Sequence, residues 1–455
     1  MSQPLPELRR ALGLIDASAI VAGTVIGTGI FLVPATVARE IGTVGGVFLV
    51  WVAGGLLSLA GALSYAELGA MFPEAGGEYA FLRRAYGPMW GFLFGWQQVV
   101  IGKTGSIASI AMAFAIFLGF FIPGLDADWI VLGEHAALSG TQLIAVASIV
   151  LLTGLNYLGV AVGGRVQSAL TVLKVAAILA LAAFAFSSGS GSWSHFAATQ
   201  ETSTQWFGLG AALAATLWSY DGWNNLTLVG AEVREPHSTI PRVLVLGLLG
   251  VMAVYLLTNL AYLYMLPLSQ MAHSPRLAQE VAVAAVGAWG GEAITIAALV
   301  STLAALNGSI LTGARVSYAM ARDRLFFRHM ADLDAKHHSP VKALLLQCLF
   351  ASILILILGH AKDAFERLFN YAVFGTWLFY GITALAVIVL RRRRPDLHRP
   401  YLTPGYPWIP LSFILVASGF CLSLMLRRPL ETGLGLALLV AGLPFYAFWH
   451  RASRR

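Results

Sequence analysis

Two short runs of helix-breaking residues lie inside long apolar segments. Residues 23–29 (GTVIGTG) carry glycines at spacings of four and two, and residues 219–225 (SYDGWNN) place an aspartate, a glycine and two asparagines close together. These residue types are poor helix formers and good turn formers. A broken helix frees C=O groups at the end of its first half and N–H groups at the start of its second half. The C=O end attracts a cation and the N–H end attracts an anion, so two such breaks can hold a zwitterion without a side-chain ion pair.

Close helix packing through Gly23 and Gly27 is the alternative explanation for the first run. Packing explains the second run poorly, because a tryptophan and an aspartate do not let helices approach closely. The two runs fall in the first and sixth apolar segments, which correspond if the first ten segments form two halves of five. Paired breaks at matching positions are typical of the binding site of inverted-repeat transporters.

The composition determines the class of protein that carries these runs. Apolar residues make up 58% of the 455 residues and charged residues 11%, whereas soluble domains have about 25% charged residues. So few charges cannot cover a soluble surface, and the apolar content excludes a disordered chain. Two cysteines, Cys348 and Cys421, exclude a disulfide scaffold. Long apolar runs without short alternating strands exclude an outer-membrane barrel. We therefore expect an all-α integral membrane protein.

Twelve apolar segments are each long enough to cross a hydrocarbon core, which needs roughly 20 residues. They are predicted at 14–38, 44–71, 89–122, 141–160, 165–187, 206–231, 241–266, 281–321, 341–359, 365–390, 408–426 and 432–449. The third and eighth exceed a single crossing, so they are expected to tilt strongly or project beyond the membrane. The hydrophilic stretches between the segments are short, which argues against a soluble enzymatic domain.

The distribution of basic residues predicts the orientation. Of the 29 Lys and Arg residues, 21 fall on the side of the N-terminus and 6 on the other side, while Lys103 and Lys174 lie within spans. The positive-inside rule therefore predicts that both termini are cytoplasmic. The net charge of +7 follows from this asymmetry and from contact with anionic lipid. It does not indicate nucleic-acid binding, and no cleavable signal peptide is predicted.

Four motifs resemble those of the amino acid–polyamine–organocation (APC) superfamily. Residues 27–31 (GTGIF) resemble its first-helix signature, while 73–79 (PEAGGEY), 306–315 (LNGSILTGAR) and 399–407 (RPYLTPGYP) resemble its L-type amino acid transporter (LAT) branch. The likeness covers roughly 10–450. It implies a five-plus-five inverted repeat, with repeats at 14–187 and 206–390 and two further helices at 408–449. Predicted cytoplasmic tails at 1–13 and 450–455 flank these parts.

The resemblance also implies a binding site at the first break. The substrate carboxylate is expected on the Thr28 hydroxyl and on the N–H groups around Gly27 and Gly29. The substrate ammonium is expected on the carbonyl of Val25. Ile26 completes this half of the expected site.

The second half of the expected site lies in helices six and eight. The carbonyls of Trp218 and Asp221 are expected to accept from the substrate ammonium beside Gly222. Trp218 also resembles the aromatic lid that closes over substrate on the outer side. Ser309 in helix eight is expected to face the substrate side chain.

Lys174 lies near the middle of the fifth segment, where a cation costs at least about 2.5–3.5 kcal/mol. One explanation is a lysine that snorkels toward the helix end. The resemblance implies another, in which the ammonium replaces the sodium ion that braces helix one against helix eight in sodium-coupled relatives. Carbonyls near Gly27 and the hydroxyl of Ser301 or Thr302 are its expected acceptors. Burial also lowers a lysine pKa, which leaves proton coupling open.

Other charges allow several roles. Lys103 is interpreted as structural, for example as the cap of a neighbouring helix end. Asp221 either selects cationic side chains or braces Asn224 and the broken backbone. Arg315 and Arg322 are interpreted as a solvated or gating cluster.

No enzymatic, metal or cofactor site is predicted. The histidines lack HxxxH spacing, and neither GxSxG nor a Walker-type phosphate loop occurs. Light subunits of the LAT branch carry a cysteine between helices three and four, but residues 123–140 contain none. A disulfide-linked heavy-chain partner is therefore not expected.

The expected function is sodium-independent exchange of neutral L-amino acids across the cytoplasmic membrane. The alternatives are a proton-coupled amino-acid symporter, and an amino-acid sensor or channel built on a transporter fold. A channel is disfavoured because nothing in the chain repeats as a symmetric filter or charge ring does.

Overall fold

The computed structural model describes residues 7–133, 136–197, 206–359 and 364–453. Residues 1–6 and 454–455 of the predicted tails lie outside this part. Within the described residues, ten helices are long and apolar enough to cross a membrane. The pair α1 (Leu14–Val25) and α2 (Gly29–Ile41) forms an eleventh span, bent by 43°. The predicted all-α membrane fold is therefore confirmed.

The first half of the chain continues after α2 with helices and one hairpin. The elements are α3 (Val44–Met71), α4 (Glu78–Tyr86), α5 (Pro88–Gln97), the π-helical turn η1 (Gln98–Gly102), α6 (Lys103–Leu118), the strands β1 (Asp128–Gly133) and β2 (Ala136–Ser139), α7 (Gly140–Tyr157), α8 (Val160–Ser187) and the 3₁₀ turn η2 (Trp193–Ala197).

The second half begins with another interrupted helix. The elements are α9 (Trp206–Ser219), α10 (Asn225–Leu228), the 3₁₀ turn η3 (Gly230–Glu232), α11 (Pro236–Met265), α12 (Leu268–His273), α13 (Leu277–Val286), α14 (Ala288–Arg322), the 3₁₀ turn η4 (Arg328–Ala331), α15 (Val341–Leu358), α16 (Ala364–Arg393), α17 (Trp408–Arg427) and α18 (Pro429–Ser453).

These elements account for the twelve predicted segments, with two corrections. The eighth segment is divided at Gly287, whose φ of 83° lies in the left-handed region that favours glycine. The first residues of this segment therefore belong to α13, while α14 alone has 35 residues and is, as predicted, longer than a single crossing needs. The predicted loop at 123–140 contains an antiparallel hairpin of β1 and β2.

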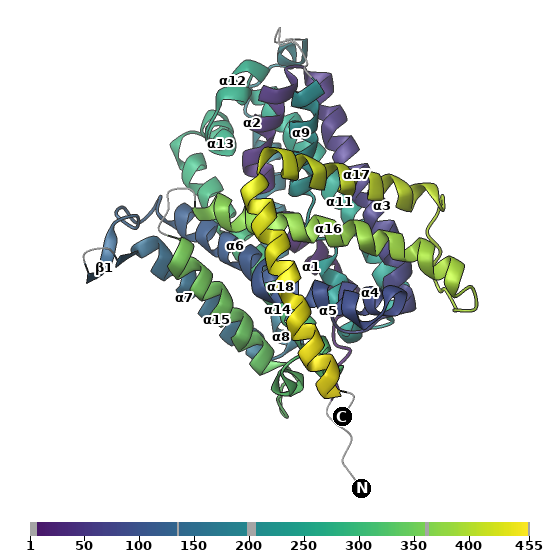
Figure 1. The fold of residues 1–455 in the computed structure, drawn as a ribbon. Helices are drawn as coiled ribbons and strands as arrows, with labels where there is room; N and C mark the ends of the chain where they lie inside the picture. Colours follow the sequence, from purple (N-terminus) through teal and green to yellow (C-terminus); the bar gives the residue numbers. More distant parts are fainter. Residues whose placement is uncertain (1–6, 134–135, 198–205, 360–363, 454–455) are drawn as a thin grey trace.

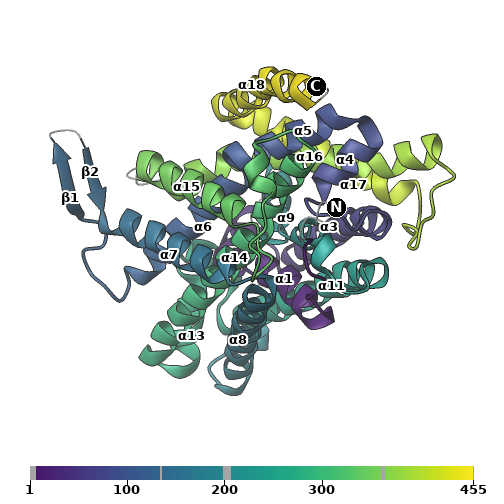
Figure 2. The same ribbon diagram turned by 90° about the horizontal axis from the view of Figure 1, so that it is seen from below.

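Helix α1 is surrounded by α8, α11 and α14, which all contact it. Figure 2 shows α1, α9 and α14 near the middle of the bundle, with α18 and the hairpin at its edges. The end of α18 lies at the same end of the bundle as the start of the chain (Figure 1). Small residues allow the close packing, because a Cβ atom on Gly23 would contact Gln167 and Thr171 of α8. Gly23 is therefore a packing residue.

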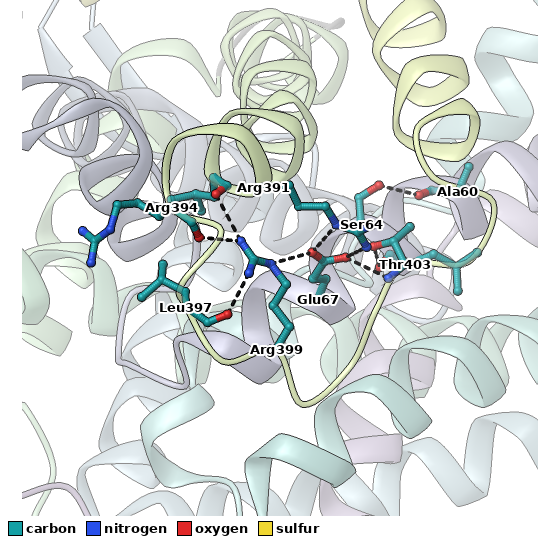
Figure 3. Close-up of polar contacts among 10 residues, drawn as sticks. Ala60, Ser64, Glu67, Arg391, Arg394, Leu397, Arg399 and Thr403 are labelled. Carbon is teal, nitrogen blue, oxygen red and sulfur yellow. Dashed lines mark hydrogen bonds and ion pairs between the residues drawn. The ribbon is translucent and has the colours of Figure 1, made fainter.

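Buried charges tie α3 to α16 and to the connection before α17 (Figure 3). Glu67 on α3 is 1% exposed and accepts from Arg391 at 2.8 and 2.6 Å. It also accepts from the Thr403 N–H at 2.8 Å, and Arg399 Nε lies 3.6 Å away. A buried carboxylate is tolerated when charged donors satisfy it in this way. The segment that carries the RPYLTPGYP motif is thus fixed to the predicted cytoplasmic ends of α3 and α16.

Candidate functional site at two broken helices

The first break lies between α1 and α2, where the glycine run predicts it. The Gly27 N–H turns back to the Val25 carbonyl at 2.8 Å and does not continue the helix. The Tyr255 hydroxyl lies 2.9 Å from the same carbonyl. Both predicted ligand groups, the Val25 carbonyl and the Gly27 N–H, are therefore engaged within the chain. Gly29 begins α2, and the first N–H groups of a helix have no acceptor one turn earlier.

The second break follows α9 and touches the first. Gly222 has φ 109°, and a Cβ atom there would lie 3.1 Å from the Thr24 carbonyl oxygen. The Thr24 hydroxyl donates to the Gly222 carbonyl at 2.9 Å. Gly222 thus serves both the left-handed turn and the close approach of the two breaks.

A cavity lies where the two breaks meet. Every predicted binding residue except Ile26 lines it: Val25, Gly27, Thr28, Gly29, Trp218, Asp221, Gly222 and Ser309. Lys174 does not line it, as expected for a residue with no role in contacting substrate. Both breaks and α14 therefore line one cavity.

Other helices contribute lining residues that the sequence reasoning missed. On α6 these include Lys103, Ser106 and Ser109, and on α16 they include Thr376 and Tyr380. The three α6 residues are spaced by three and lie on one face of a helix whose only other polar residue is Thr104. That spacing is the signal that could have located this wall of the cavity.

The two glycines of the GTGIF motif have different surroundings. A Cβ atom on Gly27 would have the Val25 carbonyl oxygen, 4.0 Å away, as its nearest neighbour. A Cβ atom on Gly29 would lie 2.7 Å from Ser219 Oγ on α9. Gly27 therefore faces open space, whereas Gly29 permits the packing of α2 against α9.

Lys174 is 1% exposed and braces three segments. Its ammonium donates to the carbonyls of Gly23 at 2.8 Å, Ile26, and Ser301 at 3.3 Å. Three carbonyls thus satisfy its three donors, and this geometry does not fit a snorkelling side chain.

The expected hydroxyl acceptors of Lys174 need correction. The Ser301 hydroxyl donates to the carbonyls of Ile26 at 3.0 Å and Gly27 at 3.3 Å. It therefore supports the brace as a second donor. The Thr302 hydroxyl donates within its own helix, to Ala298 and Leu299.

A buried polar network connects the second break to α4, α6 and α16. Lys103 donates to the side-chain oxygen of Asn225, the first residue of α10. The Tyr380 hydroxyl lies 2.8 Å from Asp221 Oδ1 and 3.0 Å from Asn224 Oδ1. The Asn224 amide donates to Glu78 Oε1 at 2.6 Å. Lys103 thus meets the start of a helix, and Asp221 reaches Asn224 through Tyr380.

The predicted cytoplasmic end is closed by ion pairs. Arg315 is 1% exposed and donates to both oxygens of Glu232 at 2.7 and 2.9 Å. The solvated role expected for Arg315 is therefore wrong. Nearby, Arg83 pairs with Asp323 at 2.5 Å.

The opposite end is hollowed by a second cavity, lined by α2, α6, α13 and α14. Thr28 and Ala113 belong to both cavities, so the candidate site adjoins a space on the predicted outer side. Within the described ranges, no three His, Cys, Asp or Glu residues are grouped so that they could hold a metal ion.

Comparisons with known proteins agree with this architecture. A model of the amino acid permease family matches residues 12–440. The chain is 32% identical to the serine/threonine exchanger SteT of Bacillus subtilis, over 96% of each chain. It is 31% identical to the b(0,+)-type amino acid transporter 1 of Mus musculus, over 97% of this chain and 88% of the relative. It is 30% identical to the large neutral amino acids transporter small subunit 2 of Oryctolagus cuniculus, over 98% of this chain and 82% of the relative.

Proposed function

Because this chain belongs to the amino acid permease family of the APC superfamily, we propose that it exchanges neutral L-amino acids across the cytoplasmic membrane, without sodium and by alternating access. The distribution of basic residues supports a cytoplasmic location for both termini. The observation that carries the proposal is the contact of two broken helices at one cavity.

The cavity offers partners for both ends of a zwitterion. The Thr28 hydroxyl and the N–H groups that begin α2 at Gly29 bind the carboxylate. The Gly27 N–H and the Val25 carbonyl play smaller parts, because each already has a partner. The Asp221 carbonyl binds the ammonium, and the Trp218 carbonyl plays a smaller part because it already accepts from the Asp221 N–H at 3.0 Å. Ser309 contacts the side chain.

Three observations support an exchanger that needs neither sodium nor a linked partner. The Lys174 ammonium donates to carbonyls on both sides of the α1–α14 contact, as a bound sodium ion would coordinate them. One relative is named as an exchanger. The absence of cysteine from residues 123–140 argues against a disulfide-linked heavy chain.

Purified protein in liposomes tests this proposal. Labelled serine or leucine should enter liposomes preloaded with amino acid much faster than empty ones, with choline in place of sodium. Equal uptake into empty liposomes, driven by an inward proton gradient, would contradict exchange and favour proton symport. Failure of every amino acid to enter under either condition would contradict transport.

A further inference from the structure

Glu78 is a buried carboxylate that the proposed transport cycle leaves without a role. It begins α4, inside the PEAGGEY motif, and is 0% exposed. Its Oε1 atom accepts from the Asn224 amide at 2.6 Å. Its Oε2 atom is buried without a hydrogen-bond partner among the described residues. One carboxylate oxygen is therefore free to hold a proton.

The groups around Glu78 do not neutralise it fully. The ionisable groups that face it are Lys103 of α6, Asp221 of the second break, Tyr65 of α3 and Tyr380 of α16. Helix α5 carries no ionisable side chain. On α14, Arg315 and Asp323 are paired with Glu232 and Arg83. Two carboxylates thus share one facing cation.

Burial is the main influence on Glu78. In the sequence, Glu78 lies after the spanning helix α3 and before α5. Burial raises the pKa of its carboxyl group to about 7. Lys103 and the Asn224 amide act in the opposite direction but do not cancel this effect. Both protonation states are therefore populated near neutral pH.

The two states differ in how strongly they hold the second break. An ionised Glu78 accepts a charge-assisted hydrogen bond from Asn224, which follows the turn at Gly222. Protonation of the free oxygen Oε2 turns the same contact into a weaker, neutral hydrogen bond. We propose that Glu78 is the residue at which this transporter takes up a proton, and that protonation loosens the second half of the broken helix from α4. This inference rests on the proposed amino-acid transport.

The first test measures exchange in liposomes with equal pH on both sides, between pH 5.5 and 8.5. Wild-type turnover should rise about fivefold as pH falls through 7. A hydrogen bond to a charged acceptor is stronger than one to a neutral acceptor by about this factor in the equilibrium constant. Glu78→Gln, which mimics the neutral state, should be fast and flat over this range. Glu74→Gln, in the same motif but partly exposed, should keep the wild-type profile. A Glu78→Gln profile with the wild-type pH dependence would overturn the proposal.

A second test measures protonation without transport. Because the folded pKa of Glu78 exceeds the usual value of about 4.5, wild-type stability should fall as pH rises from about 4.5 to 7. The Tm of Glu78→Gln in detergent should therefore match wild type near pH 5 and exceed it above pH 7. Parallel Tm curves would refute proton uptake at Glu78 even if amino acids are transported. The expected divergence in a protein that transports no amino acid would instead contradict the proposed function.

Asn224→Ala tests the route from Glu78 to the second break. It removes the amide contact but keeps the carboxyl group. The pH dependence of exchange should disappear, whereas the difference in Tm between pH 5 and pH 8 should persist. A variant that keeps the wild-type exchange profile would show that Asn224 does not transmit the protonation state.

Discussion

Replacement of Lys174 tests the brace between α1 and α14 most severely. In Lys174→Ala the Gly23 and Ser301 carbonyls lose their ammonium donor, whereas the Ile26 carbonyl keeps the Ser301 hydroxyl. The Gly23 carbonyl has no helical substitute, because the Gly27 N–H turns to Val25. The Ser301 carbonyl lies inside α14 and keeps the helical N–H of Ala305, so only the Gly23 carbonyl is orphaned. One orphaned buried carbonyl costs about 2 kcal/mol, which is about 30-fold in a rate or equilibrium constant.

Part of this cost is offset in the folded protein, because the variant no longer buries an ammonium group. We therefore expect a modest loss of stability and a large loss of turnover. Substrate affinity should change little, since Lys174 does not line the cavity.

The assay is exchange of labelled amino acid in liposomes, with turnover and KM measured separately. Lys342→Ala is the matched control, because Lys342 is an exposed lysine that pairs with Asp332 at the surface. Exchange by Glu78→Gln can also be measured between pH 6 and 8, where a permanently charged Lys174 predicts a flat profile. Wild-type turnover in Lys174→Ala would refute the brace, and a raised KM alone would place Lys174 in the binding site.

Three further predictions concern ions, the first break and the closed end. Replacing sodium with choline should leave exchange unchanged, and a clear sodium requirement would contradict a lysine that replaces the ion. Gly27→Ala should fold normally and bind amino acid more weakly by at least about tenfold, because its methyl group enters open cavity space. Normal affinity in Gly27→Ala would exclude the first break as the binding site. Gly29→Ala should instead lower Tm, since its methyl group would clash with Ser219. Arg315→Met should lower the free energy of unfolding by about 3–5 kcal/mol, because it leaves Glu232 buried and unpaired. A lowered Tm would report this loss. A second change, Glu232→Gln, should restore part of this loss, and equal stability of all three proteins would contradict the buried pair.

The main features of the fold could be predicted because they depend on local sequence. Segment length and apolar content located the spans, and the glycine run at 23–29 located the first break. The run SYDGWNN located the second break, between Ser219 and Asn225. The family match confirms a transporter and not an enzyme. The division at Gly287 was missed because the residues on both sides of that glycine are strongly apolar.

Contacts between distant residues could not be predicted in the same way. Glu78 and Asn224 are 146 residues apart in the chain, and no local pattern pairs them. Arg315 was interpreted as part of a solvated or gating cluster because it lies near the predicted cytoplasmic end of its segment, whereas its partner Glu232 lies in another segment. For Lys174 the kind of acceptor was predictable, since a broken helix must expose carbonyls. The donor role of the Ser301 hydroxyl depends on side-chain orientation, which the sequence does not determine.

The most direct test of the central claim is competition for substrate binding by analogues that lack one charge. The two broken helices should bind both the carboxylate and the ammonium of an amino acid. Unlabelled leucine should therefore displace labelled leucine from the purified protein, while leucinamide and the corresponding hydroxy acid should each compete at least about a hundredfold more weakly. Competition by either analogue as strong as that by leucine would contradict a site built from the ends of two broken helices.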